Sequence, residues 1–243
     1  MISVDSLLYK IDQRLNKLST NDHQQIALED KILALNEAQI KLLKQKVDGF
    51  STVSGLGMDA FKKRYEDLQS LVVNYIDGRL PLTLKNVELN QWTAYIHNLY
   101  PKYMFYVDSY VLADKGPCTN RKIWINKDLA KHGDLNVLLN NSHYRPSFEY
   151  QETFNFISSD EISIFTDGTF TPSDIYISYM RYPEYIDKEG YIRFDGTPSA
   201  DSNCELEQYL EDELLDLTVE NLAMYTENQS AVQSAAYRIK TNE

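Results

Sequence analysis

The residues that most often do chemistry are few and scattered in this chain. The four histidines are His23, His97, His132 and His143, and no two have the i, i+4 spacing with which a helix holds a metal ion. The chain contains no Gly-x-Ser-x-Gly nucleophile elbow and no Walker phosphate loop. We interpret the histidines as surface or structural residues, and the sequence predicts no enzyme, no cofactor and no bound metal.

Cysteine chemistry is limited to Cys118 and Cys204. Their spacing matches no metal or redox motif, so we expect two free thiols in a reducing compartment. Cys204 precedes a predicted helix, and a helix N-terminus can lower the pKa of a thiol. We nevertheless interpret Cys204 as a buried structural cysteine.

The chain is strongly acidic, with 36 Asp and Glu against 24 Lys and Arg and a net charge of -12. Tight binding to DNA or to an anionic membrane needs cationic surface, so this charge disfavours both. An acidic wall that DNA slides past fits the same charge, as does a surface that is simply soluble. A hydrolase with two carboxylates stays an alternative, because sequence alone cannot show which carboxylates meet.

Tyrosine is frequent, with 18 residues. Eight of them lie in two dense runs, namely Tyr100, Tyr103, Tyr106 and Tyr110, and then Tyr176, Tyr179, Tyr182 and Tyr185. Half-buried strand positions, where tyrosine packs well, are one interpretation. Contact with another protein is a second, because tyrosine is enriched in interface hot spots. A polysaccharide-binding surface is a third.

Helices are expected at both ends of the chain. Apolar residues at i, i+3, i+4 and i+7 predict helices over 3–18 and 23–47, and a third is expected over 58–75 after a Gly-rich linker. Near the C-terminus, the spacing of Ser202 and Glu205 is that of a capping box, which predicts a helix over 205–226.

Short β-rich runs fill the middle of the chain. The predicted strands are 82–89, 103–111, 121–125, 150–157, 161–165 and 174–182, with 92–100 either a strand or a short helix. The sequence therefore predicts an α+β fold, in which a helical bundle from the N- and C-terminal segments carries an inserted antiparallel β-sheet or sandwich. The expected domains are 1–77, 78–198 and 199–243, and the last packs with the first.

The predicted helix 205–226 has two apolar stripes on roughly opposite sides. One contains Leu206, Leu210, Leu214, Leu217 and Met224, and the other contains Leu215, Val219 and Leu222. A helix with two apolar sides must be covered on both, so we predict that a neighbouring subunit covers the second. The candidate interface residues are Leu215, Val219, Leu222, Tyr179, Tyr182 and, in a small-residue helix expected over 228–243, Tyr237.

One spaced motif in the C-terminal half resembles a known family. It consists of Tyr179-x-Arg181-x-Pro183 with Ile186 and Asp187, followed by Asp201-x-x-Cys204-Glu205-Leu206. This pattern, over about a quarter of the chain, is similar to the C-terminal half of small virion proteins of crAss-like phages, which are ring proteins that connect the portal to the tail.

The resemblance implies a structural virion protein of a phage neck, a head-tail connector made in the host cytoplasm. Copies would form a closed homo-oligomeric ring. Because portals are commonly twelve-fold, the resemblance implies that this ring is a dodecamer. Its partners would be the portal protein and other ring or tail proteins, with DNA only as passing cargo and no membrane. The alternatives are a receptor- or carbohydrate-binding virion module and the acidic hydrolase.

Overall fold

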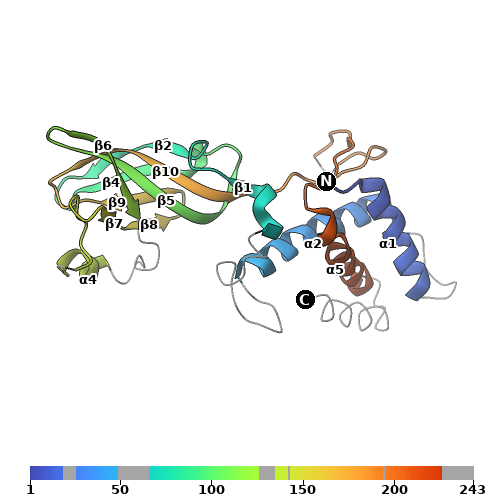
Figure 1. Cartoon of the computed structure of the whole chain (residues 1–243). Coiled ribbons are helices and arrows are strands. Elements are labelled where there is room, and N and C mark those ends of the chain that lie inside the picture. The colour runs from blue at the N-terminus through green and yellow to red at the C-terminus, as the bar shows by residue number, and fades with distance from the viewer. Residues whose placement is uncertain (19–25, 49–65, 126–134, 142, 194, 226–243) are drawn as a thin grey trace. The chain divides into compact units, whose positions relative to one another are not determined.

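The fold is α+β, as the sequence predicted, and the chain divides into two compact units (Figure 1). The computed structural model describes residues 1–18, 26–48, 66–125, 135–141, 143–193 and 195–225. Met1–Ser70 and Pro183–Glu243 form one unit, which we call the helical unit, and Leu71–Tyr182 form the other, the β unit. The β unit is thus an insertion between the two segments that build the helical unit.

The boundaries of the β unit differ from the predicted 78–198. It begins earlier because β1 (Val72–Val73) and β2 (Arg79–Pro81) both pair antiparallel with β10 (Thr171–Arg181). The prediction of a helix over 58–75 is therefore wrong at its C-terminal end, because a 3-10 turn, η2 (Gln69–Leu71), leads directly into β1. Residues 183–198 belong to the helical unit, so the β unit also ends earlier than expected.

The two N-terminal helices are confirmed. α1 covers Val4–Leu18, and α2 covers Leu28–Asp48, starting later than the predicted residue 23. The C-terminal helix α5 covers Glu211–Tyr225 and is preceded by the 3-10 turn η5 (Gln208–Leu210). The further helix expected over 228–243 lies outside the described residues.

α5 is the central element of the helical unit, because it packs against both α1 and α2 (Figure 1). Most of its side chains are buried, including residues of both predicted apolar stripes, such as Leu214, Leu215 and Leu222. The segments at the two ends of the chain therefore cover α5 within one molecule.

The acidic residues of α5 are paired with basic residues of the two N-terminal helices. From α1, Lys10 lies 2.7 Å from Glu211, and Arg14 contacts both Asp212 and Asp216. From α2, Lys41 lies 2.8 Å from Glu220, and Lys46 lies 2.7 Å from Glu213 and 3.3 Å from Asp67. Much of the acidic face of this helix is therefore neutralised inside the chain.

The β unit contains two sheets. The first has the order β1-β10-β5-β6-β7 with β2 also on β10, where β5 is Tyr103–Lys115, β6 is Cys118–Ile125 and β7 is Glu152–Thr153. The second has the order β3-β4-β9-β8, where β3 is Thr83–Asn86, β4 is Gln91–Tyr95, β8 is Asn155–Ser158 and β9 is Glu161–Phe165. All these pairs are antiparallel except β6 with β7.

The predicted strands are found, and several change length. The predicted 150–157 is split into β7 and β8, and the undecided 92–100 contains both a strand, β4, and a 3-10 turn, η3 (Ile96–Asn98). A short helix, α4 (Leu135–Asn140), was not expected.

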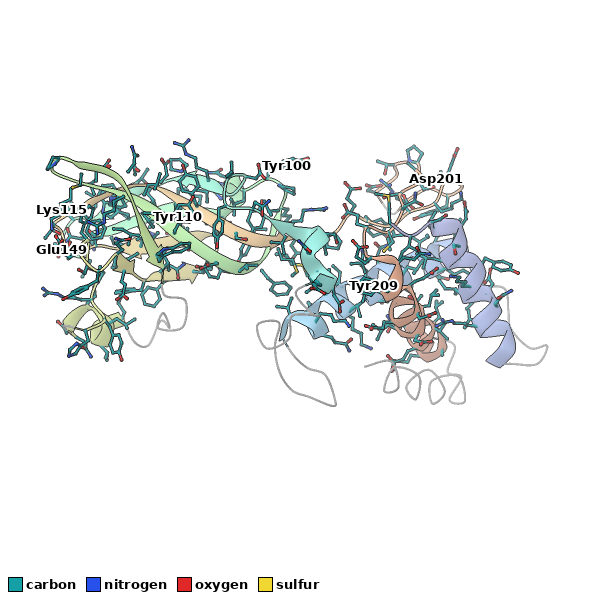
Figure 2. The ribbon with its side chains drawn as sticks, in the orientation of Figure 1. Tyr100, Tyr110, Lys115, Glu149, Asp201 and Tyr209 are labelled. Carbon is teal, nitrogen blue, oxygen red and sulfur yellow. The ribbon has the colours of Figure 1, made fainter. Side chains whose placement is uncertain are left out.

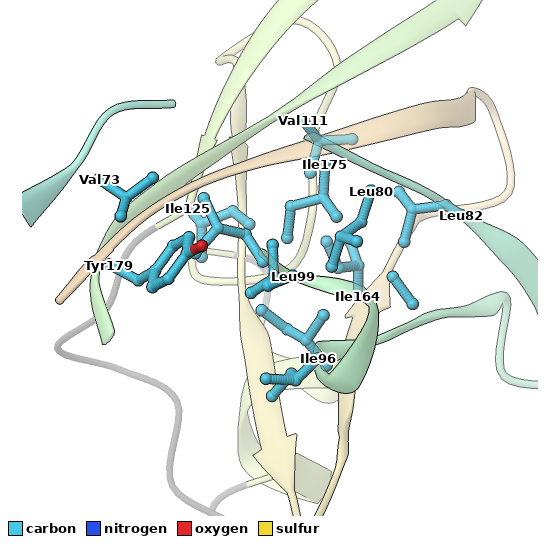
Figure 3. Packing of buried hydrophobic residues seen from close by; sticks show 13 residues of the cluster. Val73, Leu80, Leu82, Ile96, Leu99, Val111, Ile125, Ile164, Ile175 and Tyr179 are labelled. Atoms are coloured by element: carbon cyan, nitrogen blue, oxygen red, sulfur yellow. The ribbon is translucent and has the colours of Figure 1, made fainter. Parts of the chain in front are cut away.

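The two sheets enclose a shared apolar core (Figure 3). Val111, Ile175 and Ile177 come from the first sheet, and Ala94 and Ile164 come from the second, all almost fully buried. Burying each such aliphatic side chain contributes roughly 1.5–3 kcal/mol. Because side chains alternate along a strand, the neighbours of these residues in β5 and β10 lie on the opposite face of the first sheet.

Removing the buried partner of Arg14 is expected to cost far more stability than removing the exposed one. The side chain of Asp216 is 3% exposed and that of Asp212 is 74% exposed. Asp216→Ala leaves a guanidinium beside an apolar interior and should lower the free energy of unfolding by about 3 kcal/mol. Asp212→Ala, the matched control on the same helix and arginine, should cost about 1 kcal/mol or less. Urea unfolding followed by helical circular dichroism measures both, and equal losses would contradict this account.

Candidate functional site

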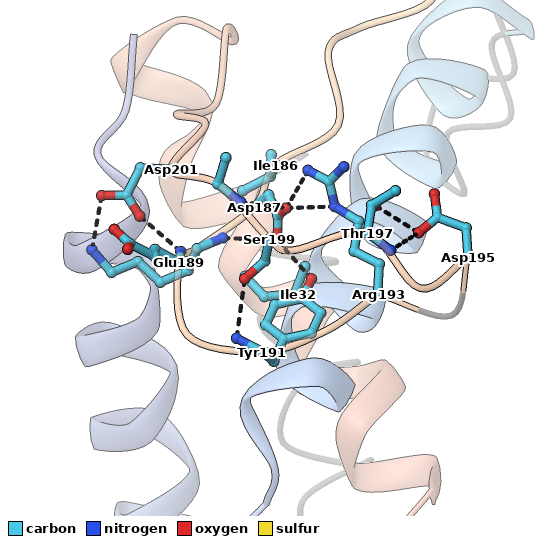
Figure 4. Close-up of polar contacts among 12 residues, drawn as sticks. Ile32, Ile186, Asp187, Glu189, Tyr191, Arg193, Asp195, Thr197, Ser199 and Asp201 are labelled. Carbon is cyan, nitrogen blue, oxygen red and sulfur yellow. Dashed lines mark hydrogen bonds and ion pairs between the residues drawn. The ribbon is translucent and has the colours of Figure 1, made fainter.

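The later residues of the resemblance motif, from Ile186 to Leu206, lie in a segment, 184–206, that folds around one buried carboxylate. Asp187 is fully buried. Its oxygens accept hydrogen bonds from the Tyr191 hydroxyl at 2.6 Å and from Arg193 Nε at 2.9 Å (Figure 4). The backbone N–H groups of Lys188 and Ala200 donate to the same carboxylate. Asp187 therefore holds together both sides of a loop that has little regular secondary structure.

The electrostatics of Asp187 are those of a structural ion pair. Burial by itself raises the pKa of this carboxyl, but the hydrogen bonds from Tyr191 and Arg193 lower it more, so the pKa lies below its ordinary value. The carboxylate is thus ionised and paired at neutral pH.

The same segment is fastened to both N-terminal elements of the helical unit. Asn36 of α2 exchanges two hydrogen bonds with the backbone of Ile186, at 2.8 and 2.9 Å. Ile2 and Cys204 exchange backbone hydrogen bonds, and the Asn203 side chain accepts one from the N–H of Val4 at the start of α1. The motif therefore describes how this unit folds.

The predicted capping box is wrong. The backbone of Ser202 pairs with that of Asp187, and the carboxylate of Glu205 accepts a hydrogen bond from the N–H of Glu184 at 2.8 Å. Both residues are thus engaged by the earlier segment that contains Glu184 and Asp187, and α5 begins only at Glu211.

The two cysteines are free, as expected, and differ in exposure. Cys118 is exposed and Cys204 is buried. Burial raises the pKa of the Cys204 thiol to about 11, so it stays protonated at neutral pH and is a poor nucleophile. This agrees with the structural interpretation of Cys204.

Four of the six predicted interface residues are buried inside the chain. Leu215, Val219 and Leu222 are at most 1% exposed because α5 is covered within the helical unit, and Tyr179 is 0% exposed. The Tyr179 ring belongs to the core of the β unit, and its hydroxyl donates to the carbonyl of Pro101. These four side chains have no surface left for a neighbouring subunit, so their predicted interface role is wrong.

The burial argument does not apply to the other two predicted interface residues, Tyr182 and Tyr237. Tyr182 is 44% exposed, with Lys102 Nζ 5.4 Å from its ring centroid, so its interface role stays a prediction. Tyr237 lies outside the described residues.

The structure brings other aromatic residues together on the face of the first sheet opposite the core. They form what we call the stacked row, which consists of Arg79 (β2), Tyr176 (β10), Tyr110 (β5), and Lys122 and Trp124 (β6). Figure 2 labels Tyr110, which lies on the central strand of this row. Direct strand register creates it, because Tyr110 is opposite both Tyr176 and Trp124.

The contacts in the stacked row are cation–π and π–π contacts. Tyr110 and Tyr176 are parallel, with centroids 4.9 Å apart. Lys122 Nζ lies 3.8 Å from the centroid of Tyr110 and 4.0 Å from that of Trp124, and Arg79 Cζ lies 5.9 Å from that of Tyr176. Such contacts between strands stabilise a sheet, and tryptophan, tyrosine and arginine are also enriched in the hot spots of protein interfaces.

Sequence reasoning named Tyr110 and Tyr176 but missed the cations. The signal for Lys122 was its position two residues before Trp124 in a strand, which places both on one face. No comparable signal existed for Arg79, because β2 was not expected and its pairing with β10 is non-local.

The remaining chemistry-bearing residues do not converge. His97 lies 2.5 Å from the exposed Asp160, His143 is exposed, and His23 and His132 lie outside the described residues. Over the described ranges, no group of three or more His, Cys, Asp or Glu side chains has the geometry of a metal site. No helix in the described part of the chain is long and apolar enough to span a membrane.

Comparison with known proteins adds no family assignment. No protein-family model matches this chain, and no curated protein matches it significantly.

Replacing Asp187 should destabilise the helical unit. Asp187→Asn removes the negative charge that pairs with Arg193 and should lower the free energy of unfolding by about 3 kcal/mol at neutral pH. Asp195→Asn is the matched control, because Asp195 is exposed in the same loop and accepts its hydrogen bonds from Thr197, as an asparagine oxygen also can. Urea unfolding of both variants measures the difference, and an effect at Asp187 no larger than at Asp195 would refute the central role of this carboxylate.

The effect of Asp187 should depend on pH. Because its pKa is lower in the folded chain than the roughly 3.9 of an unfolded aspartate, its stabilisation is fully present above about pH 5. The stabilisation is lost as the pH falls through the folded pKa. The difference in unfolding free energy between the wild type and Asp187→Asn should therefore shrink steadily in acid, and a difference that grows below pH 4 would be inconsistent with this linkage.

The two thiols should react at very different rates. With Cys118 exposed and Cys204 buried with a pKa of about 11, a thiol reagent at neutral pH should label one cysteine in the folded chain and both in urea. Peptide mass spectrometry identifies the labelled residue. Rapid labelling of Cys204 in the folded chain would contradict its burial.

Proposed function

We propose that this chain is a structural protein of a phage neck, a head-tail connector of which copies form a closed ring around the DNA channel. It would join the portal to tail components and would be made in the host cytoplasm before assembly into the virion. DNA would be passing cargo, and the chain would have no catalytic role.

The resemblance motif carries this proposal. Its residues Ile186, Asp187, Cys204 and Leu206 are all completely buried in the helical unit. A motif of this kind is a signature of a fold, so a chain that shares it is expected to share the architecture of the connector proteins. The role follows by analogy with them. The second apolar stripe of α5 no longer supports the ring, because this chain itself buries Leu215, Val219 and Leu222.

A surface suited to protein contact also supports a structural role. The stacked row combines a tryptophan that is 45% exposed with two tyrosines and Arg79, and Trp, Tyr and Arg are the residue types enriched in interface hot spots. The strand order places Tyr176 between Arg79 and Tyr110, and Tyr110 between Tyr176 and the β6 residues Lys122 and Trp124.

The proposal predicts that the chain is a stoichiometric component of mature particles. Quantitative mass spectrometry of purified, DNA-filled virions from the encoding phage should find about one copy per portal subunit, since stacked rings share rotational symmetry. A reconstruction of the same particles should place the chain between the portal and the tail.

Deletion of the gene is the complementary experiment. The deletion should yield heads without attached tails, and a complementing copy of the gene should restore tail attachment. Absence of the chain from intact particles, or full infectivity of the deletion, would overturn the proposed function.

A further inference from the structure

The stacked row exposes a lysine that has aromatic neighbours but no acidic partner. Besides its contacts with Tyr110 and Trp124, Lys122 Nζ lies 5.8 Å from the ring centroid of Tyr75. No carboxylate among the described residues forms a salt bridge with it. Lys122 is half-buried, and its ammonium group sits within three ring contacts and carries three hydrogen-bond donors.

Two carboxylates of the same sheet face are already engaged. Asp174 lies 3.0 Å from Arg79 in a salt bridge, and Asp108 accepts a hydrogen bond from the Tyr75 hydroxyl at 2.8 Å. Glu152, the register partner of Trp124, lies on the same face, and none of the three forms a salt bridge with Lys122 among the described residues.

The other free polar groups of the row can all donate hydrogen bonds. The hydroxyls of Tyr110 and Tyr176 and the indole N–H of Trp124 have no hydrogen-bond partner in the described part of the chain. Burial raises the pKa of the Tyr110 hydroxyl, which keeps it protonated. Together with the Lys122 ammonium group, these groups suit a ligand that is anionic and rich in acceptors.

The charge of the chain is divided unequally between its two units. The β unit, Leu71–Tyr182, contains 10 Lys and Arg against 12 Asp and Glu, a net charge of -2. The helical unit contains 14 Lys and Arg against 24 Asp and Glu, a net charge of -10. An anionic partner of the stacked row is thus available on every other copy of the same chain.

We propose that the stacked row, with Lys122 at its centre, binds a carboxylate on the helical unit of a second copy of this chain. This inference rests on the proposed ring, because a contact between two different surfaces is the heterologous kind that a closed ring needs. The partner carboxylate pairs with Lys122 and accepts hydrogen bonds from the hydroxyl and indole groups beside it.

Self-association of three variants tests the inference. Sedimentation velocity of the full chain over a range of concentrations and salt should show association that weakens with ionic strength. Lys122→Met keeps the aliphatic stem on the rings but removes the charge, and should weaken the association about tenfold or more. Lys122→Arg keeps a cation that stacks on aromatic rings and should stay near the wild type.

Lys85→Met is the matched control. Lys85 is also a β-unit lysine with an exposed side chain, but it lies on the second sheet and pairs with Glu161. Its replacement should leave the association unchanged. Thermal unfolding of each variant separates a folding defect from a binding defect, since a purely structural role of Lys122 would lower stability without changing the association of the folded chain.

The outcomes distinguish this inference from the proposed function. Equal association of the wild type and Lys122→Met, or a wild type that stays monomeric at every concentration, would overturn the inference, while presence in virions would still support the connector role. Binding of duplex DNA that Lys122→Met abolishes, with self-association unchanged, would assign the row to phosphate and would also overturn it. Loss of self-association in Lys122→Met, together with its retention in Lys122→Arg, would support the inference.

Discussion

The helical unit depends on burying an acidic helix without leaving its carboxylates unpaired. α5 is apolar on two sides and acidic between them, so its neighbours must supply both apolar surface and cations. α1 and α2 do this together, with Arg14 on Asp216 and Lys41 on Glu220. A buried carboxylate that lost its partner would cost several kcal/mol, so the pairing also selects the orientation of α5 on the two helices. Because these elements come from opposite ends of the chain, the intervening residues Leu71–Tyr182 form a separate unit between the two segments of the helical unit.

The first and last strands of the β unit, β1 and β10, pair with each other. Val72, just after the chain leaves the helical unit, is the register partner of Met180, just before it returns. An insertion whose ends are adjacent can be added to a unit without separating the segments that flank it. After the return, the loop around Asp187 combines a few isolated backbone pairs, such as Asp187 with Ser202, with side-chain and backbone hydrogen bonds to the buried carboxylate of Asp187.

Local pattern predicted the elements well where neighbours in sequence decide the structure. The apolar periodicity found α1 and α2, and alternation found most of the strands. It failed where a segment distant in sequence binds a group that the local pattern assigns to a helix cap. The carboxylate of Glu205 accepts a hydrogen bond from the N–H of Glu184, and α5 starts six residues later than predicted. It failed again for α5 as an interface, because periodicity shows how many sides of a helix are apolar but not how many helices the same chain brings to it. The stacked row shows the same limit, since Tyr110 and Lys122 were visible in the sequence while their partners depend on strand register.

These failures change which residues should carry function. Ile186, Asp187, Cys204 and Leu206 of the motif are buried and hold the fold of the helical unit. In the proposed ring, assembly specificity would instead come from exposed positions. Lys122 and Trp124 are such positions, since each combines partial exposure with a fixed place on a rigid sheet. In the proposed ring, the chain's excess of acid would have a use beyond solubility, because repulsion between like charges on two copies disfavours contacts that do not involve a cation such as Lys122.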